Sequence, residues 1–358
     1  MNGGMHSRRS VLASLGAATA FSFSLDGCQS RDRDAIGFYN WDSFIGPHTA
    51  RAFERRTGIA VEQSVFATDD ELFAKLSGGS EDYDVVVPSH TGVERLVAAR
   101  LLQALDPAAL PNLRNLTPFW RDPAYDRGCR HSVPYSWTVT GLGYRQLRLQ
   151  PAGAVPDSWQ MAFASPRYAH RIALLPASTP LLTLGAKFIG RPLSPATVGS
   201  VTDMLIAQKP AVAYLTNDGT DMLVADRVDV AMVDNAALAA ATAHTAGLGF
   251  VVPREGGLLR ADALAIPRAA RRPAAAQAFI DFLLSAEAAR DLARLTGFPT
   301  PNAAARAQMP AAYRDSPVLF PTGPGMAASS FGHLVDEADA LVFDHATRRL
   351  RAAPPSDR

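Results

Sequence analysis

Apolar runs of strand length alternate along this chain with stretches whose apolar residues recur at helical spacing. Strand-like runs lie at 35–39, 59–66 and 84–87, and helical patterns lie between and after them at 48–56, 69–76 and 91–100. Such alternation predicts parallel strands joined by crossover helices. A longer apolar stretch at 133–144 is expected to be a strand that crosses into a second lobe.

The same pattern continues beyond residue 144. Further strands are expected at 172–175, 212–215, 228–233 and 248–252, with helices at 181–188, 198–208, 220–226 and 236–244. A strand at 259–266 would return to the first lobe, before a long amphipathic helix at 274–295 and a final helix at 331–350. The pattern covers about 330 residues, more than one hydrophobic core usually holds, so we predict an α/β fold with two lobes.

The first residues have the pattern of an export signal. Arg8 and Arg9 precede an apolar run at 11–25, which is shorter than the roughly 20 residues that span a bilayer. We predict a twin-arginine signal peptide at 1–27 and a periplasmic protein, with an ordinary Sec signal as the alternative. Residues 25–28, Leu-Asp-Gly-Cys, resemble a lipobox, in which Cys28 would carry the lipid anchor. Cys129 would then be unpaired, or it would form a disulfide with an unmodified Cys28.

Charge and motifs exclude several classes of function. The net charge is +1, whereas a nucleic-acid-binding protein has a strong basic excess. The sequence has no Gly-x-Ser-x-Gly, His-Glu-x-x-His, Walker or Cys-x-x-Cys motif, so we expect no catalysis, no metal and no cofactor. A periplasmic enzyme whose site is assembled in space is kept as an alternative. We interpret Asp69, Asp70 and Glu71 as complementing a helix dipole, and His90 as a polar loop residue.

The segment 38–44, Phe-Tyr-Asn-Trp-Asp-Ser-Phe, ends the first expected strand. In α/β proteins, ligands often bind at such strand ends. Aromatic faces attract cations, and Asp42 would pair with one, so the segment indicates a site for a small cation. The alternative is an aromatic core strand followed by a solvated aspartate.

Six short segments carry a family resemblance, and they occur in order at 38–41, 83–89, 133–137, 253–257, 262–267 and 297–302. Together they resemble the spermidine/putrescine-binding proteins of bacterial polyamine ABC transporters, over about residues 35–350. The resemblance implies a two-lobed periplasmic binding protein, type II-like, with hinge strands and a central ligand cleft. It also implies a monomer that captures a polyamine and delivers it to a membrane permease, without a cofactor and without chemistry.

The resemblance further implies which residues face the ligand. The matching positions are Trp41 as an aromatic wall, with Ser43 and Phe44 beside it at the strand end, and Ser89 for a hydroxyl in the cleft. Asp262 matches a carboxylate that binds an ammonium group, and Phe298 stands where the family often has tyrosine.

The chain also departs from the family pattern. Ser43 stands where the family often has an acidic residue, and Asp42 lies one position earlier. No acidic residue occurs at 175–184, a segment from which family members supply carboxylates. Asp234 stands at the position of a common wall tryptophan, and Arg260 replaces another aromatic residue. If Asp42, Asp234, Asp262 and Arg260 all face inward, the cleft has a charge of about −2, which suits a diamine such as putrescine.

Arg260 leaves the ligand class open. In a polyamine site it must pair with Asp234 or Asp262 or point outward, whereas in a site for a zwitterionic or amino-acid-like amine it would face the ligand carboxylate. A lipid-anchored adaptor that has lost transport is a further alternative. The expected domains are a signal at 1–27, lobe 1 at 28–140, lobe 2 at 141–258, a return to lobe 1 at 259–310, a C-terminal helical segment on lobe 2 at 311–350, and a tail at 351–358.

Overall fold

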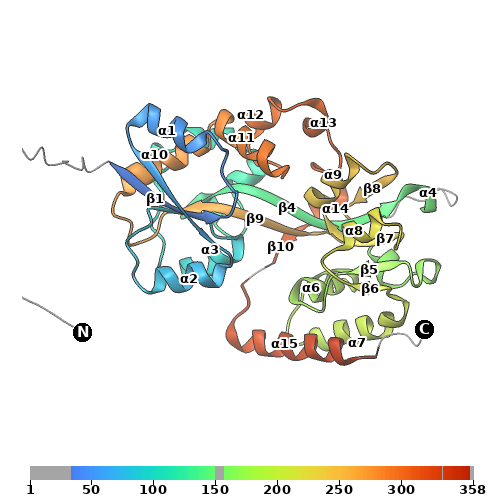
Figure 1. Cartoon of the computed structure of the whole chain (residues 1–358). Helices are drawn as coiled ribbons and strands as arrows, with labels where there is room; N and C mark the ends of the chain where they lie inside the picture. Colours follow the sequence, from blue (N-terminus) through green and yellow to red (C-terminus); the bar gives the residue numbers. More distant parts are fainter. Residues whose placement is uncertain (1–33, 150–156, 333, 355–358) are drawn as a thin grey trace, which may run out of the picture. The chain divides into compact units, whose positions relative to one another are not determined.

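The computed structural model describes residues 34–149, 157–332 and 334–354 (Figure 1). The signal peptide and the lipobox cysteine Cys28, both predicted from the sequence, lie outside these residues. Cys129 is a buried thiol without a disulfide partner among the described residues, and burial raises its pKa to about 12.

The first elements alternate as the hydrophobic pattern predicts. Strand β1 (Ala35–Trp41) pairs in parallel with β2 (Ala60–Phe66) and with β3 (Val85–Val86). The helices are α1 (Thr49–Thr57), α2 (Asp69–Ser77) and α3 (His90–Ala98). Short 3₁₀ turns lead from α3 to the next strand, at Pro107–Ala109, Pro111–Asn115, Pro118–Arg121 and Arg127–Cys129.

Two strands, β4 (Ser132–Arg145) and β9 (Leu258–Ala265), link the two halves of the sheet. They pair antiparallel and run side by side through the middle of Figure 1. β9 also pairs with β3, whereas β4 continues to β7 (Val230–Asp234) and β8 (Leu248–Val251). The sheet is therefore mixed, and not purely parallel as the alternation predicts, because the chain crosses between the halves in both directions.

The second half repeats the strand and helix alternation. β5 (Ile172–Leu174) lies in parallel between β6 (Tyr214–Leu215) and β7. The helices are α4 (Gln146–Leu149), α5 (Gln160–Phe163), α6 (Thr179–Phe188), α7 (Val198–Gln208), α8 (Gly219–Val224) and α9 (Asn235–Thr242), with 3₁₀ turns at Pro166–Tyr168 and Lys209–Ala211.

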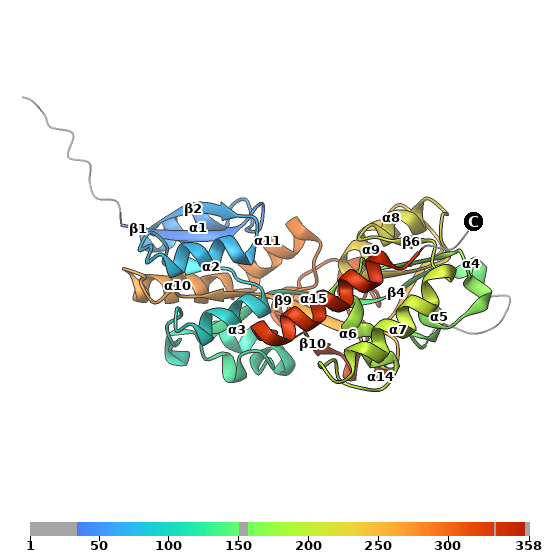
Figure 2. The same cartoon turned by 90° about the horizontal axis from the view of Figure 1, so that it is seen from below.

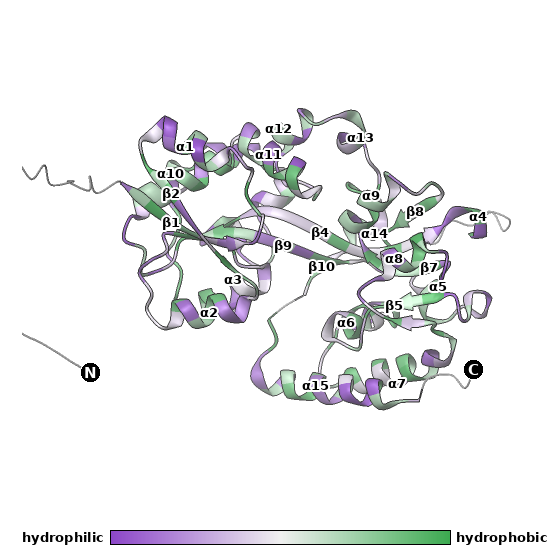
Figure 3. Cartoon of the chain, viewed as in Figure 1, coloured by the Kyte–Doolittle hydropathy of each residue, from purple (hydrophilic) through white to green (hydrophobic). Residues whose placement is uncertain are grey.

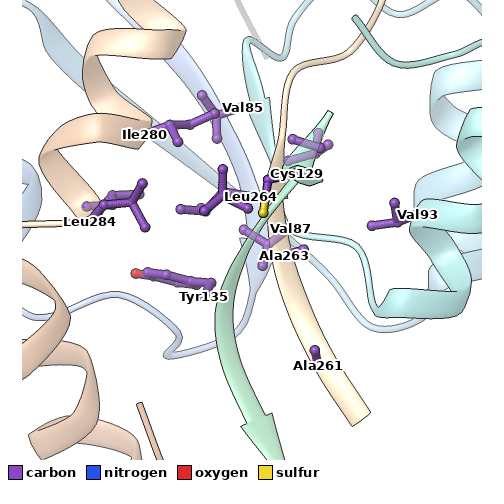
Figure 4. Packing of buried hydrophobic residues seen from close by; sticks show 14 of the residues in the cluster. Val85, Val87, Val93, Cys129, Tyr135, Ala261, Ala263, Leu264, Ile280 and Leu284 are labelled. Atoms are coloured by element: carbon purple, nitrogen blue, oxygen red, sulfur yellow. The ribbon is translucent and has the colours of Figure 1, made fainter. Parts of the chain in front are cut away.

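The buried apolar residues form separate clusters in the two halves. One cluster includes Phe38, Val133 and Leu264, and Figure 4 shows part of it. A second cluster includes Trp159 and Leu181, and a third, smaller one extends it on the other side of β7. Each half thus buries its own apolar faces, as two lobes require. Figure 3 shows β9 with a hydrophilic stretch where it passes from one half to the other.

The helix expected at 274–295 is two helices, α10 (Pro273–Leu283) and α11 (Ala286–Thr296). Ser285 separates them, and its Oγ accepts a hydrogen bond from the Ala288 N–H at 3.3 Å. A capping serine starts a new helix because it satisfies an N–H group that has no partner within the first turn.

The C-terminal segment differs from the expectation that 311–350 packs on the second lobe. Leu319, Phe320 and Phe331 belong to the first cluster, and strand β10 (Ser330–Phe331) pairs with β9. The short helices here are α12 (Ala303–Ala307), α13 (Ala311–Arg314) and α14 (Pro324–Ala327). The last helix, α15 (Glu337–Ala352), does belong to the second cluster and packs against α6 and α7 (Figure 2). It begins later than the expected residue 331 because Asp336 caps it.

Candidate functional site

One face of the paired strands β4 and β9 carries polar side chains. Asp262 lies opposite Ser136, and Arg260 lies opposite Thr138. Asp234 of β7 pairs with the β4 residue two positions beyond Thr138. Residues opposite each other in a sheet point to the same face, and so do residues two apart on one strand. Asp262, Arg260 and Asp234 therefore share a face.

Asp262 is a half-buried carboxylate on β9. Its Oδ2 accepts a hydrogen bond from Ser136 Oγ at 2.9 Å, and its backbone forms a bridge to Ser89. Burial raises its pKa to about 6, although the Ser136 bond and the charge of Arg260 act in the opposite direction and the charge of Asp69 adds to the rise. No ion pair to Asp262 is found within the described part of the chain, so a ligand ammonium would offset the unfavourable burial of its charge.

Ser89 lies at the start of α3 and connects that helix to Asp69 of α2. Its Oγ accepts a hydrogen bond from the Gly92 N–H at 3.2 Å and donates one to Asp69 Oδ2 at 2.5 Å. Its N–H donates to Asp69 Oδ1 at 3.0 Å. Asp69 therefore places a negative charge at the N-terminus of α3, where the helix dipole favours it.

This contact of Asp69 with the neighbouring helix was missed in the sequence, where Asp69 was interpreted as complementing the dipole of the helix that it begins. Thr68 caps α2 by accepting the Glu71 N–H, so Asp69 is left to contact the neighbouring helix. The sequence feature that could have indicated this role is a threonine, able to cap α2, immediately before the acidic run.

The segment that ends β1 is only partly open to a ligand. Trp41 is half-buried and packs at 4.4 Å, centroid to centroid, on Phe66. Asp42 and Ser43 are exposed, and Ser43 has a φ of 54°. Phe44 is buried, and its ring lies 5.9 Å from that of Phe298. Phe44 is thus mainly a packing residue, because its edge-on neighbours cover it.

Asp234 and Arg260 do not pair with each other. Asp234 caps α9, since its Oδ1 accepts the Ala237 N–H at 2.8 Å. Arg260 is exposed, and neither a hydrogen bond nor an ion pair of its side chain is found among the described residues. It lies near enough to Asp262 for its charge to lower the pKa of that carboxyl. Among the described residues, Arg260 thus has neither of the two ion pairs, with Asp234 or with Asp262, that were expected for it in a polyamine site.

A cavity of about 880 Å³ lies beside this polar face. Its walls come from α3, α6, β9 and the segment that leads into α15, and its polar lining residues include Thr91, Thr179, Thr183, Lys187, Arg191, Arg260, Asp336 and Asp339. Of the ligand residues predicted from the sequence, Arg260 lines this cavity, whereas Trp41, Asp42, Ser43, Phe44, Ser89, Asp234, Asp262 and Phe298 do not. The inward orientation of all four charged residues, which gave the cleft a charge of about −2, is therefore not what the structure has. Sequence reasoning missed Lys187 and Arg191, although Thr179, Thr183 and Lys187 recur at the four-residue spacing of one helix face.

Two other features bear on the class of protein. Among the described residues, no group of three or more His, Cys, Asp or Glu side chains is placed to hold a metal ion. None of the helices in the described residues has the length and apolar character needed to cross a membrane.

Comparison with known proteins gives a consistent result. The model of a family described as bacterial extracellular solute-binding protein matches residues 48–321. The chain is 27% identical over 343 residues to the spermidine/putrescine-binding periplasmic protein of Salmonella typhimurium, which covers 94% of this chain and 97% of that protein. It is 28% identical over 306 residues to the putrescine/cadaverine-binding protein of Pseudomonas aeruginosa, covering 82% and 86% of the two chains.

The fold has solved counterparts as well. A spermidine/putrescine ABC transporter substrate-binding protein from Streptococcus pneumoniae superposes with a TM-score of 0.80 at 23% identity, covering 89% of this chain and 98% of that one. A putative spermidine/putrescine ABC transporter from Listeria monocytogenes has a TM-score of 0.73 at 26% identity, covering 90% and 100%. The fold is that of the two-lobed periplasmic binding proteins, which confirms the fold expected from the sequence.

Proposed function

Because the chain belongs to the bacterial extracellular solute-binding protein family, we propose that it captures a polyamine in the periplasm and delivers it to the membrane permease of an ABC transporter. The observation that carries this proposal is the half-buried carboxylate of Asp262, which has a serine as its hydrogen-bond partner and no ion pair in the described chain. Relatives named as binders of spermidine, putrescine and cadaverine support the same ligand class. An ammonium group would pair with the Asp262 carboxylate, and it is the charged group that the amines named for these relatives carry.

In the proposed site, an ammonium group binds Asp262 next to the Ser89–Asp69 pair. Trp41 and Phe298 are half-buried aromatic residues that would lie along the methylene chain of the ligand. We retain Ser43 as an exposed contact at the mouth, whereas Phe44 and Asp234 act through packing and helix capping.

Capture would proceed by closure of the two lobes around the ligand, with β4 and β9 as hinge strands and no chemical step. The first lobe supplies Ser89 and Asp262, and Thr179 and Thr183 of α6 line the cavity from the second lobe. A ligand that contacts both lobes favours the closed state by as much as it binds that state more tightly. We assign the lobes to the two groups of apolar clusters, and we propose that the protein acts as a monomer.

Export belongs to the same proposal. We propose that Arg8 and Arg9 direct the chain to the twin-arginine pathway and that Cys28 becomes the lipidated N-terminus. The Arg8→Lys, Arg9→Lys variant should accumulate as precursor in the cytoplasm, and mass spectrometry of the mature wild type should find acylated Cys28. Normal export of the variant would indicate a Sec signal, and an unmodified N-terminus would exclude the anchor.

The ligand class is tested by thermal unfolding in the presence of putrescine, cadaverine and spermidine. At a concentration about 100 times Kd, a ligand that binds only the folded state adds about 2.7 kcal/mol to the free energy of unfolding. We expect a rise in Tm of several degrees for the wild type and for Asp221→Asn, which changes an exposed carboxylate on α8. The rise should be much smaller for Asp262→Asn. If no amine changes the Tm of the wild type, the proposed function is wrong.

A further inference from the structure

Asp262 lies on the same strand face as Arg260, which lines the cavity, although Asp262 itself is not part of the lining. On the side of the first lobe, Ser89 joins Asp69 to the strand that carries Asp262. On the side of the second lobe, α6 presents Thr179, Thr183 and Lys187, and Arg191 follows just beyond the helix. The sequence of α6 contains no acidic residue. A ligand that reaches from Asp262 into this cavity would therefore meet a carboxylate at its first end and cations on the second-lobe wall.

Arg260 lies between these two regions on the polar face of β9. It is two residues from Asp262, a spacing of about 6.6 Å along a strand, and it lines the cavity with an exposed side chain. It has no hydrogen bond or ion pair within the described residues. An unpaired guanidinium repels the second ammonium of a diamine, whereas its planar fork matches a carboxylate with two parallel hydrogen bonds.

The acidic residues on the C-terminal side of the cavity do not remove this positive charge. Asp336 and Asp339 line the cavity at the start of α15. Asp336 accepts the Asp339 N–H at 2.8 Å as the cap of that helix, so its carboxylate is held at α15. Against these two carboxylates stand three cations, Lys187, Arg191 and Arg260. Lys187 donates a hydrogen bond to the Ala328 carbonyl at 3.2 Å, a neutral partner that leaves its charge uncompensated.

We propose that the ligand is an amine whose other end carries a carboxylate, such as an ω-amino acid or a polyamine derivative with a terminal acid group. Its ammonium group binds Asp262, and its carboxylate lies toward Arg260, with Lys187 and Arg191 adding to the positive field. This inference rests on the proposed function for the amine site at Asp262 and for delivery to a permease, and it replaces the simple polyamine of that proposal by an amine with a terminal carboxylate.

The experiment compares ligands of matched length that differ in one end group. Calorimetry with the wild type should give tighter binding of γ-aminobutyrate than of putrescine, and of δ-aminovalerate than of cadaverine. Arg260→Met should weaken binding of the amino acids about 10- to 100-fold, the range expected for a lost hydrogen bond between charged groups. The same variant should leave binding of the diamines unchanged or tighter. Arg55→Met is the control, because it removes an exposed guanidinium on α1, outside the cavity lining.

A second variant tests the same inference in case Arg260→Met alters the folding of the protein. Arg191→Met lies on the opposite wall of the cavity and should also lower affinity for the amino acids more than for the diamines. If the diamines bind the wild type as tightly as the amino acids or more tightly, this inference is wrong while the proposed function stands. The same conclusion holds if neither Arg260→Met nor Arg191→Met changes the preference. If no amine of either kind binds, the proposed function itself fails.

Discussion

At the scale of single residues, the ionisation of Asp262 links ligand binding to stability. Burial raises the pKa of this carboxyl to about 6, from an ordinary value of 3.8. The folded protein therefore holds the proton more tightly than the unfolded chain between these two values. Stability from this group is fully present below pH 3.8 and is lost as the pH rises through about 6. At neutral pH the half-buried carboxylate of Asp262 is ionised and makes the ligand-free protein less stable than it is at low pH.

Asp262→Asn should therefore stabilise the ligand-free protein at neutral pH while it weakens amine binding. Because one pKa unit corresponds to about 1.4 kcal/mol, we expect a gain of about 1–3 kcal/mol in the free energy of unfolding near pH 8 and little gain near pH 4. Urea unfolding at the two pH values measures this, with Asp221→Asn as the control. An Asp262→Asn protein that is less stable than the wild type near pH 8 would contradict the account that ionisation of this half-buried carboxyl lowers stability.

At the scale of elements, the start of α3 depends on a close approach between two helices. A Cβ atom on Gly92 would lie 2.5 Å from Asp69 Oδ1 and 3.0 Å from the Pro88 Cβ. The absence of a side chain at Gly92 thus lets Asp69 reach both the N–H and the hydroxyl of Ser89. The position of Ser89 opposite Asp262 follows from this packing, because the same residue caps the helix and its backbone bridges to β9.

Gly92→Ala should lower both stability and ligand affinity, although alanine is the better helix former. The methyl group would push the Asp69 carboxylate off Ser89, which removes two hydrogen bonds with charged character, each worth about 1.5–3 kcal/mol. Gly199→Ala in α7 is the matched control, since its added Cβ meets nothing within 4 Å. That control should stabilise the protein by about 0.5–1 kcal/mol without changing affinity. Equal effects of the two substitutions in thermal unfolding and calorimetry would show that the Asp69–Ser89 contact is unimportant.

At the scale of the whole molecule, two groups of apolar clusters are joined by continuous strands. β4 begins in the first cluster with Val133 and Val139 and reaches the second with Leu142. β9 likewise passes from Leu258, in the second cluster, to Leu264 in the first. Strands that cross between cores can bend while each core stays packed, which is the arrangement that hinge closure needs.

Ligand binding should make the protein more compact. Small-angle scattering of the wild type should give a smaller radius of gyration at saturating ligand, because contacts from both lobes favour the closed state. At the same ligand concentration Asp262→Asn should keep the larger radius, since it loses the ammonium contact on the first lobe. A radius that stays constant while calorimetry reports binding would mean that the ligand occupies one lobe without closure.

The sequence by itself determined the features that depend on neighbours in the chain. Hydrophobic periodicity gave the order of strands and helices, and ordered motifs such as 83–89 and 262–267 gave the family, which the comparisons confirm. The prediction of a single long helix at 274–295 was wrong. In the sequence, Ser285 cannot be told from any other polar helix residue, and only the structure shows that its Oγ accepts the Ala288 N–H and starts a new helix.

Only the tertiary structure decided which charges meet. Asp69 and Ser89 are 20 residues apart, and Ser136 and Asp262 are 126 apart, so their contacts depend on strand register and helix packing. Asp234 and Arg260 lie on one face, yet Asp234 caps its own helix and Arg260 stays unpaired in the cavity wall. Local propensity acts over a few residues, whereas register shifts of one residue turn a side chain to the opposite face. The charge of the cleft, and with it the end groups of the ligand, is therefore a property of the folded sheet.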